Sequence, residues 1–243
     1  MNQNQTQFNE SSISLQSIIL FLFASATGML VAVLLLPIVL PNMQFSLSGD
    51  APKAYWYLSR GTAFVSLSLL WISMALGLGI TNKAARFWPG LPATFAIHEY
   101  VSLLGLAFAA FHALIILGDH YIQFTFLQLL VPFSTVDYRP FWVGIGQIGF
   151  YVWAIVAVSF YIRPVIGQKF WRFLHYASFG MYVLGIAHGI FSGTDTSMGW
   201  AQNYYWFSAG SLIFLFTARI IGSLLEVLFP AKKQVPTPRP TQG

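Results

Sequence analysis

The sequence predicts an all-α integral membrane protein, a bundle of six transmembrane helices. Of its 243 residues, 56% are hydrophobic and only 8% are charged, whereas a soluble domain carries about 25% charged residues. Six apolar segments are each long enough to cross a bilayer. They are about Leu15–Leu40, Tyr55–Ile80, Leu91–Leu117, Phe141–Ile162, Phe173–Phe191 and Tyr205–Phe229.

These segments divide the chain into three parts. Residues 1–14 are expected to form a cytoplasmic N-terminal segment, and residues 15–229 the six-helix domain. The first apolar run contains Pro37 and is too long for the apolar core of a signal peptide, so it is interpreted as a retained helix. Residues 230–243 are Pro-rich and basic and are expected to be a disordered cytoplasmic tail.

The lysines and arginines predict the orientation of the bundle. One side carries nine of them: Lys83, Arg86, Arg163, Lys169, Arg172, Arg219, Lys232, Lys233 and Arg239. The other side carries three: Lys53, Arg60 and Arg139. The positive-inside bias therefore predicts cytoplasmic termini, in a bacterial inner membrane. Because this charge orients helices, the net charge of +5 does not indicate nucleic-acid binding.

Two pairs of histidines lie inside the apolar segments. His98 and His112 are fourteen residues apart, and His175 and His188 are thirteen apart. A histidine in hydrocarbon is costly, so four of them in two helices indicate a function. At 1.5 Å of rise per residue, each pair spans roughly 20 Å. The third and fifth helices both run outward, which predicts the pairs His98–His175 on the cytoplasmic side and His112–His188 on the outer side.

Facing pairs of neutral imidazoles are suited to holding two haem b groups as axial ligands. Two histidines give a six-coordinate iron that transfers electrons. The chain has no cysteine, which excludes thiolate-ligated haem, covalent haem attachment and cysteine-ligated iron–sulfur clusters. The alternative is a non-redox transporter or scaffold in which the histidines pack or bind a metal. The colour of the purified protein distinguishes the two.

The two spacings differ in helical geometry. Fourteen residues bring His112 within roughly 40° of the face of His98, as one haem-facing stripe requires. Thirteen residues place His188 about 140° from His175 in an ideal helix. Either Gly180 or Gly185 marks an irregular turn, or the two haems approach different sides of this helix.

With these residues the chain resembles the ferric reductase-like transmembrane domain family, which includes the membrane parts of NADPH oxidases, ferric reductases and the bacterial methionine sulfoxide reductase system. The resemblance covers about residues 55–219 and rests on the histidine spacings, the six-span layout, and the stretches LSRGTAF and WRFLHYASF. It implies two b-type haems that carry electrons outward, with Arg60 beside the outer haem.

In one respect the chain departs from this family. Complete reductases continue into an FAD- and NADPH-binding domain, whereas this chain ends about 14 residues after the sixth segment and has no dinucleotide-binding glycine motif. We therefore expect a membrane electron-transfer component of an oxidoreductase. Its donor would be a separate flavoprotein or a quinol, and its acceptor ferric iron, oxygen or a periplasmic reductase partner.

Three further features have alternative interpretations, and a fourth has a single one. Arg60 could pair with a propionate of the outer haem or anchor its helix at the interface. Trp171 and its basic neighbours could hold an inner propionate or a donor protein, or serve as anchors. His120 could bind iron or relay a proton, or be a solvated loop residue. The loop 118–140 is expected to lie on the outer interface and cap the outer haem.

Overall fold

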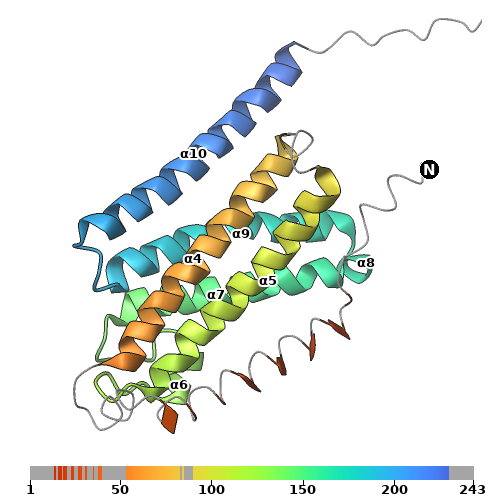
Figure 1. The fold of residues 1–243 in the computed structure, drawn as a ribbon. Helices are drawn as coiled ribbons and strands as arrows, with labels where there is room; N and C mark the ends of the chain where they lie inside the picture. Colours follow the sequence, from red (N-terminus) through yellow and green to blue (C-terminus); the bar gives the residue numbers. More distant parts are fainter. Residues whose placement is uncertain are drawn as a thin grey trace, which may run out of the picture.

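The computed structural model describes residues 53–82, 84 and 90–229, together with scattered residues between 14 and 39, and within these ranges all regular structure is helical. The long helices are α4 (Ala54–Thr81), α5 (Leu91–Ile115), α7 (Pro140–Tyr161), α9 (Gln168–Ser192) and α10 (Gly199–Leu228). Short helices connect them: η3 (Ile116–Gly118), α6 (Phe126–Leu130) and α8 (Arg163–Ile166). Figure 1 shows their arrangement.

Among the described residues, four helical segments are long and apolar enough to cross a membrane. They are Ala54–Thr81, Leu91–Gly118, Pro140–Tyr161 and Gly199–Leu228. Helix α9 is as long as α5, with 25 residues, but Lys169 and Arg172 near its start, together with two tyrosines and three glycines, lower its mean hydropathy. The first predicted span, Leu15–Leu40, lies largely outside the described residues. The described residues are thus all-helical with four candidate spans, whereas the six-span count remains a prediction.

Proline and glycine define where the helices begin. Proline occupies the first turn of α5 and of α7, where its missing N–H would have no helical partner in any case. Gly90 and Gly167 precede α5 and α9 with φ angles of 103° and 83°, a left-handed region that favours glycine. Gly167 therefore allows the sharp break between α8 and α9.

The helices pack as two antiparallel pairs plus one outer helix. Helix α4 packs mainly on α5, α7 packs mainly on α9, and α10 packs on α4. The buried core between them is apolar and includes Leu67, Leu70, Met74, Leu106, Trp153 and Met181. A Cβ atom at Gly105 would lie 2.8 Å from the Trp153 ring. This glycine therefore lets the indole of α7 reach the backbone of α5.

Candidate functional site

The structure brings the four intramembrane histidines together in the two pairs predicted from helix direction. The ring centres of His98 (α5) and His175 (α9) are 6.2 Å apart. Those of His112 (α5) and His188 (α9) are 6.0 Å apart. The two rings of each pair are inclined by 72°. Helices α5 and α9 each pack on another helix, so these side chains meet across the space between the two helix pairs.

The separation of the rings matches two imidazoles on opposite sides of one metal ion. A first-row metal lies about 2.0–2.1 Å from an imidazole nitrogen, and the ring centre is roughly 1.1 Å further away. Two such ligands in line therefore have centres about 6.3 Å apart. Both observed distances, 6.2 and 6.0 Å, are within a few tenths of an ångström of this value.

Three of the four histidines are oriented by a main-chain oxygen. The Nδ1 atom of His98 lies 2.8 Å from the oxygen of Ser73, and that of His112 lies 2.7 Å from the oxygen of Ser59. The Nδ1 atom of His188 lies 2.9 Å from the oxygen of Trp142. A carbonyl only accepts, so Nδ1 carries the hydrogen and Nε2 keeps its lone pair. Histidines that bind a metal through one ring nitrogen commonly donate the hydrogen of the other nitrogen to a carbonyl or carboxylate in this way.

The two serines were not among the predicted site residues, although the sequence contains an indication of them. Ser59 and Ser73 are fourteen residues apart on α4, the same spacing as His98 and His112 on α5. Because α4 and α5 are antiparallel neighbours, equal spacing places each serine opposite one histidine. The Ser59 hydroxyl also donates to the main-chain oxygen of His112 at 2.9 Å.

His175 is held differently from the other three. No hydrogen bond joins its ring to any residue in the part of the chain that the structure describes. Its ring instead stacks on Trp171, one turn earlier in α9, with centres 5.2 Å apart and an inclination of 29°. The guanidinium carbon of Arg163 lies 5.9 Å from the same indole. Lys169 and Arg172, the basic neighbours of Trp171, are exposed.

Helix α9 is continuous from Gln168 to Ser192, so there is no irregular turn at Gly180 or Gly185. The thirteen-residue spacing left two alternatives open. A continuous helix favours the second, in which His175 and His188 project from different sides of α9. His188 lies directly against Gly146 of α7, where a Cβ atom would overlap its imidazole. Gly146 is a further site residue that the sequence did not indicate.

A cavity of about 420 Å³ surrounds the outer pair, within the range of pockets that bind small molecules and cofactors. Its wall is mostly apolar and includes His112, His188, Leu67, Leu70, Met181 and Gly185. Phe124, Gln128, Leu129 and Leu130 also line it, so the loop 118–140 contributes to the wall of the cavity that contains His112 and His188. Gln147 of α7 fixes this loop by donating to the oxygens of Gln128 and Leu129, both at 2.7 Å.

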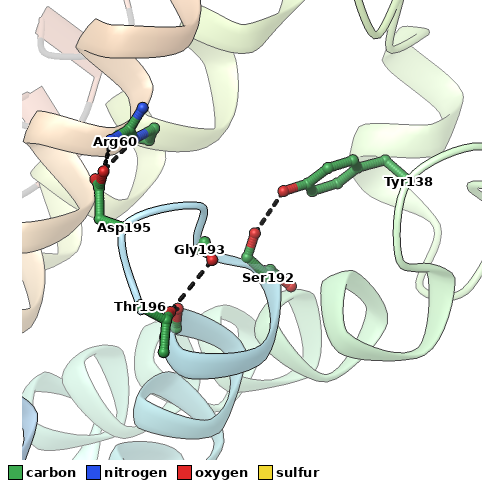
Figure 2. A network of polar contacts seen from close by, with 7 residues as sticks. Arg60, Tyr138, Ser192, Gly193, Asp195 and Thr196 are labelled. Atoms are coloured by element: carbon green, nitrogen blue, oxygen red, sulfur yellow. Dashed lines mark hydrogen bonds and ion pairs between the residues drawn. The ribbon is translucent and has the colours of Figure 1, made fainter. Parts of the chain in front are cut away.

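Arg60 also lines the outer cavity, but its partner is a residue that the sequence analysis did not predict. Its Nε donates to Oδ2 of Asp195 at 2.8 Å, and its Nη2 pairs with Oδ1 of the same carboxylate. Figure 2 shows this ion pair beside the loop 193–198. The guanidinium is therefore engaged by a carboxylate of the protein itself.

The end of α9 is held by three neighbouring side chains. The hydroxyl of Tyr138 donates to the oxygen of Ser192 at 2.5 Å, and that of Thr196 donates to the oxygen of Ile190 at 2.7 Å. Arg139 donates to the oxygen of Phe191. Burial raises the pKa of Tyr138, which keeps its hydroxyl a donor. These contacts satisfy carbonyls that a helix end otherwise leaves unpaired.

The remaining predicted residue, His120, lies exposed in the turn after η3. In the described residues no group of three or more His, Asp or Glu side chains could hold a metal ion. The histidines therefore occur as pairs.

Comparisons with protein-family models, with curated proteins and with solved structures found no match to this chain.

Proposed function

We propose that this protein is a membrane cytochrome that holds two haem b groups and transfers electrons across the membrane. The observation that supports this most is the arrangement of the two histidine pairs, with ring centres 6.2 and 6.0 Å apart. Three of these rings direct Nδ1 toward a main-chain oxygen, which leaves Nε2 for a metal. We also propose that the chain belongs to the ferric reductase-like family that its sequence resembles.

In this proposal each residue has a defined task. His98 and His175 would bind the inner iron, and His112 and His188 the outer iron, through Nε2. The carbonyls of Ser59, Ser73 and Trp142 fix the ring orientations and make the ligands more basic. Haem b supplies a one-electron Fe(III)/Fe(II) couple. Because two histidines of the protein would hold each iron, the sites would favour electron transfer over binding of a substrate at the metal.

The pairing itself argues against a bare metal ion as the ligand. A zinc or iron ion bound only by protein needs three or more side-chain ligands, and the described residues contain no such group. Two opposed imidazoles suit a metal whose other four ligands belong to a macrocycle. The apolar cavity of about 420 Å³ around the outer pair provides room for a flat ring.

The proposed orientation rests on the charge bias of the sequence, and the proposed outward direction of transfer rests on the family resemblance. With nine basic residues on one side against three on the other, His98 and His175 would lie in the cytoplasmic half. Electrons would enter there from a separate flavoprotein or from a membrane quinol. They would leave beside His112 and His188 to ferric iron, oxygen or a periplasmic protein.

Purification of the full chain with added haemin tests the proposal. We expect a red protein with a b-type band in the reduced spectrum and two haems per polypeptide in a pyridine haemochrome assay. The matched control is a variant with all four histidines replaced by alanine, which should be colourless. A wild-type chain that is folded, helical and colourless would contradict the proposal and favour packing histidines in a transporter or scaffold.

A further inference from the structure

The wall of the outer cavity contains an ion pair between Arg60 of α4 and Asp195 of the loop 193–198. Both residues line the same cavity as His112 and His188. Two guanidinium nitrogens contact the two carboxylate oxygens, the bidentate geometry that gives arginine–carboxylate pairs their strength and orientation.

The pair is more buried than a surface salt bridge. Asp195 is only 6% exposed, and the side chain of Arg60 is 26% exposed. A buried carboxylate without a partner is costly, and so is a half-buried guanidinium next to an apolar cavity. Each charge therefore compensates the other, and the wall that both residues share is neutral.

The pair also connects the loop 193–198 to a helix on the opposite side of the cavity. Asp195 is seven residues after His188, and the loop directly follows α9. Tyr138 holds the end of α9 from one direction, while Arg60 holds the loop from another (Figure 2). The position of the helix end that carries His188 thus depends on contacts with two separate parts of the chain.

On the basis of the proposed function, we propose that Asp195 is a positioning residue of the outer site. Paired with Arg60, it keeps this wall of the cavity electrically neutral and holds the loop 193–198 against α4. Removing one partner leaves a unit charge near the outer iron, in surroundings where charges interact more strongly than in water. A remaining positive charge favours the reduced iron, which carries one charge less, and a remaining negative charge favours the oxidised iron.

Redox titration of the haemin-loaded full chain tests this, with the inner haem as an internal reference. Asp195→Asn should raise the outer midpoint potential, and Arg60→Gln should lower it. The double variant Arg60→Gln/Asp195→Asn has no net charge change and should return the potential toward the wild-type value. Asp137→Asn removes an exposed carboxylate of the preceding outer loop and is the matched control, with no expected shift.

Two results would overturn the inference. One is an outer potential that no single variant moves. The other is a shift of the same sign in Asp195→Asn and Arg60→Gln, because structural damage rather than charge would then be the cause.

A second readout does not need haem, so it separates failure of this inference from failure of the proposed function. The chain has no cysteine, and Ser192→Cys places one reporter thiol at a buried position next to the loop. A thiol reagent should label this cysteine several-fold faster when Asp195→Asn is added, and Asp137→Asn should not change the rate. Equal rates in all three proteins would show that the pair does not hold the loop.

Discussion

The main-chain oxygen of Ser59 accepts the Nδ1 hydrogen of His112 at 2.7 Å, while the hydroxyl of the same serine donates to the main-chain oxygen of His112 at 2.9 Å. One residue of α4 therefore fixes both the ring and the backbone of a residue of α5. The ring contact is repeated between Ser73 and His98, where the oxygen lies 2.8 Å from Nδ1, whereas the main-chain oxygen of His98 accepts from the hydroxyl of Ser102 on the same helix. Helix α4 contributes no ligand, yet it orients both ligands of α5.

Replacement of the serine hydroxyl is the mildest test of this arrangement. Ser59→Ala removes the hydroxyl that donates to the main-chain oxygen of His112 and lies 3.0 Å from its Nδ1, but it keeps the carbonyl that orients His112. We expect the variant to retain its outer haem and to lose about 0.5–1.5 kcal/mol of stability. Thermal unfolding in detergent, monitored at the haem band, measures both effects. Complete loss of the outer haem would mean that the hydroxyl, rather than the carbonyl, orients the ring.

The two histidine pairs should be separable. His112→Ala and His188→Ala should remove the same spectral component, because their rings face each other at 6.0 Å. His98→Ala and His175→Ala should remove the other component. Low-temperature reduced spectra of the four variants provide the measurement. If His112→Ala removed the component that His175→Ala removes, the pairing would be wrong.

Gly146 should be required for the outer site alone. An alanine there would place its Cβ inside the imidazole of His188, so His188 must turn away from its partner. We expect Gly146→Ala to lose most of the outer haem and keep the inner one. Gly180→Ala is the matched control, because no atom lies within 4 Å of a Cβ at that position of α9. Haem content per polypeptide distinguishes the two, and equal content would contradict the prediction.

The inner iron should be the one that opens to external ligands. Within the described residues His175 has ring stacking on Trp171 in place of a hydrogen bond, so less energy opposes its dissociation. Trp171→Leu should increase carbon monoxide binding to the reduced inner haem severalfold. Trp142→Leu keeps the carbonyl that orients His188 and is the control. Carbon monoxide difference spectra measure this, and a larger response at the outer haem would refute it.

The inclination of the rings predicts a magnetic signature. In each pair the imidazole planes are 72° apart. Nearly perpendicular ligand planes leave two iron d orbitals almost equal in energy, which makes the ferric low-spin spectrum highly anisotropic. We expect both haems to give a single dominant low-field line in electron paramagnetic resonance. A three-line rhombic spectrum, typical of parallel imidazoles, would show that the rings rotate when the haems bind.

The histidine pairs could be predicted from sequence because the depth of a residue in the membrane and the direction of its helix both follow from positions along the chain. Charge bias gives the direction of each helix, and position within a helix gives depth, so His98 is matched with His175 without any knowledge of packing. Gly146 and Asp195 could not be found in this way. Their roles depend on which helix or loop lies beside His188 and Arg60, which is a property of the tertiary structure. Ser59 and Ser73 could be found in part, since their fourteen-residue spacing repeats that of His98 and His112, but their contacts with these histidines depend on how α4 packs on α5.

The division of the ligands between two helix pairs has a consequence for biogenesis. The pair α4 and α5 supplies His98 and His112, and the pair α7 and α9 supplies His175 and His188. Neither half has a complete set of ligands, so neither could hold a haem alone. Each half could therefore enter the membrane and fold as a hairpin before any cofactor arrives. Haem insertion would then be a late step that joins the halves. Cellular haem supply, rather than translation of this chain, would set how much mature protein accumulates, and unfilled chains would be the preferred targets of membrane proteases.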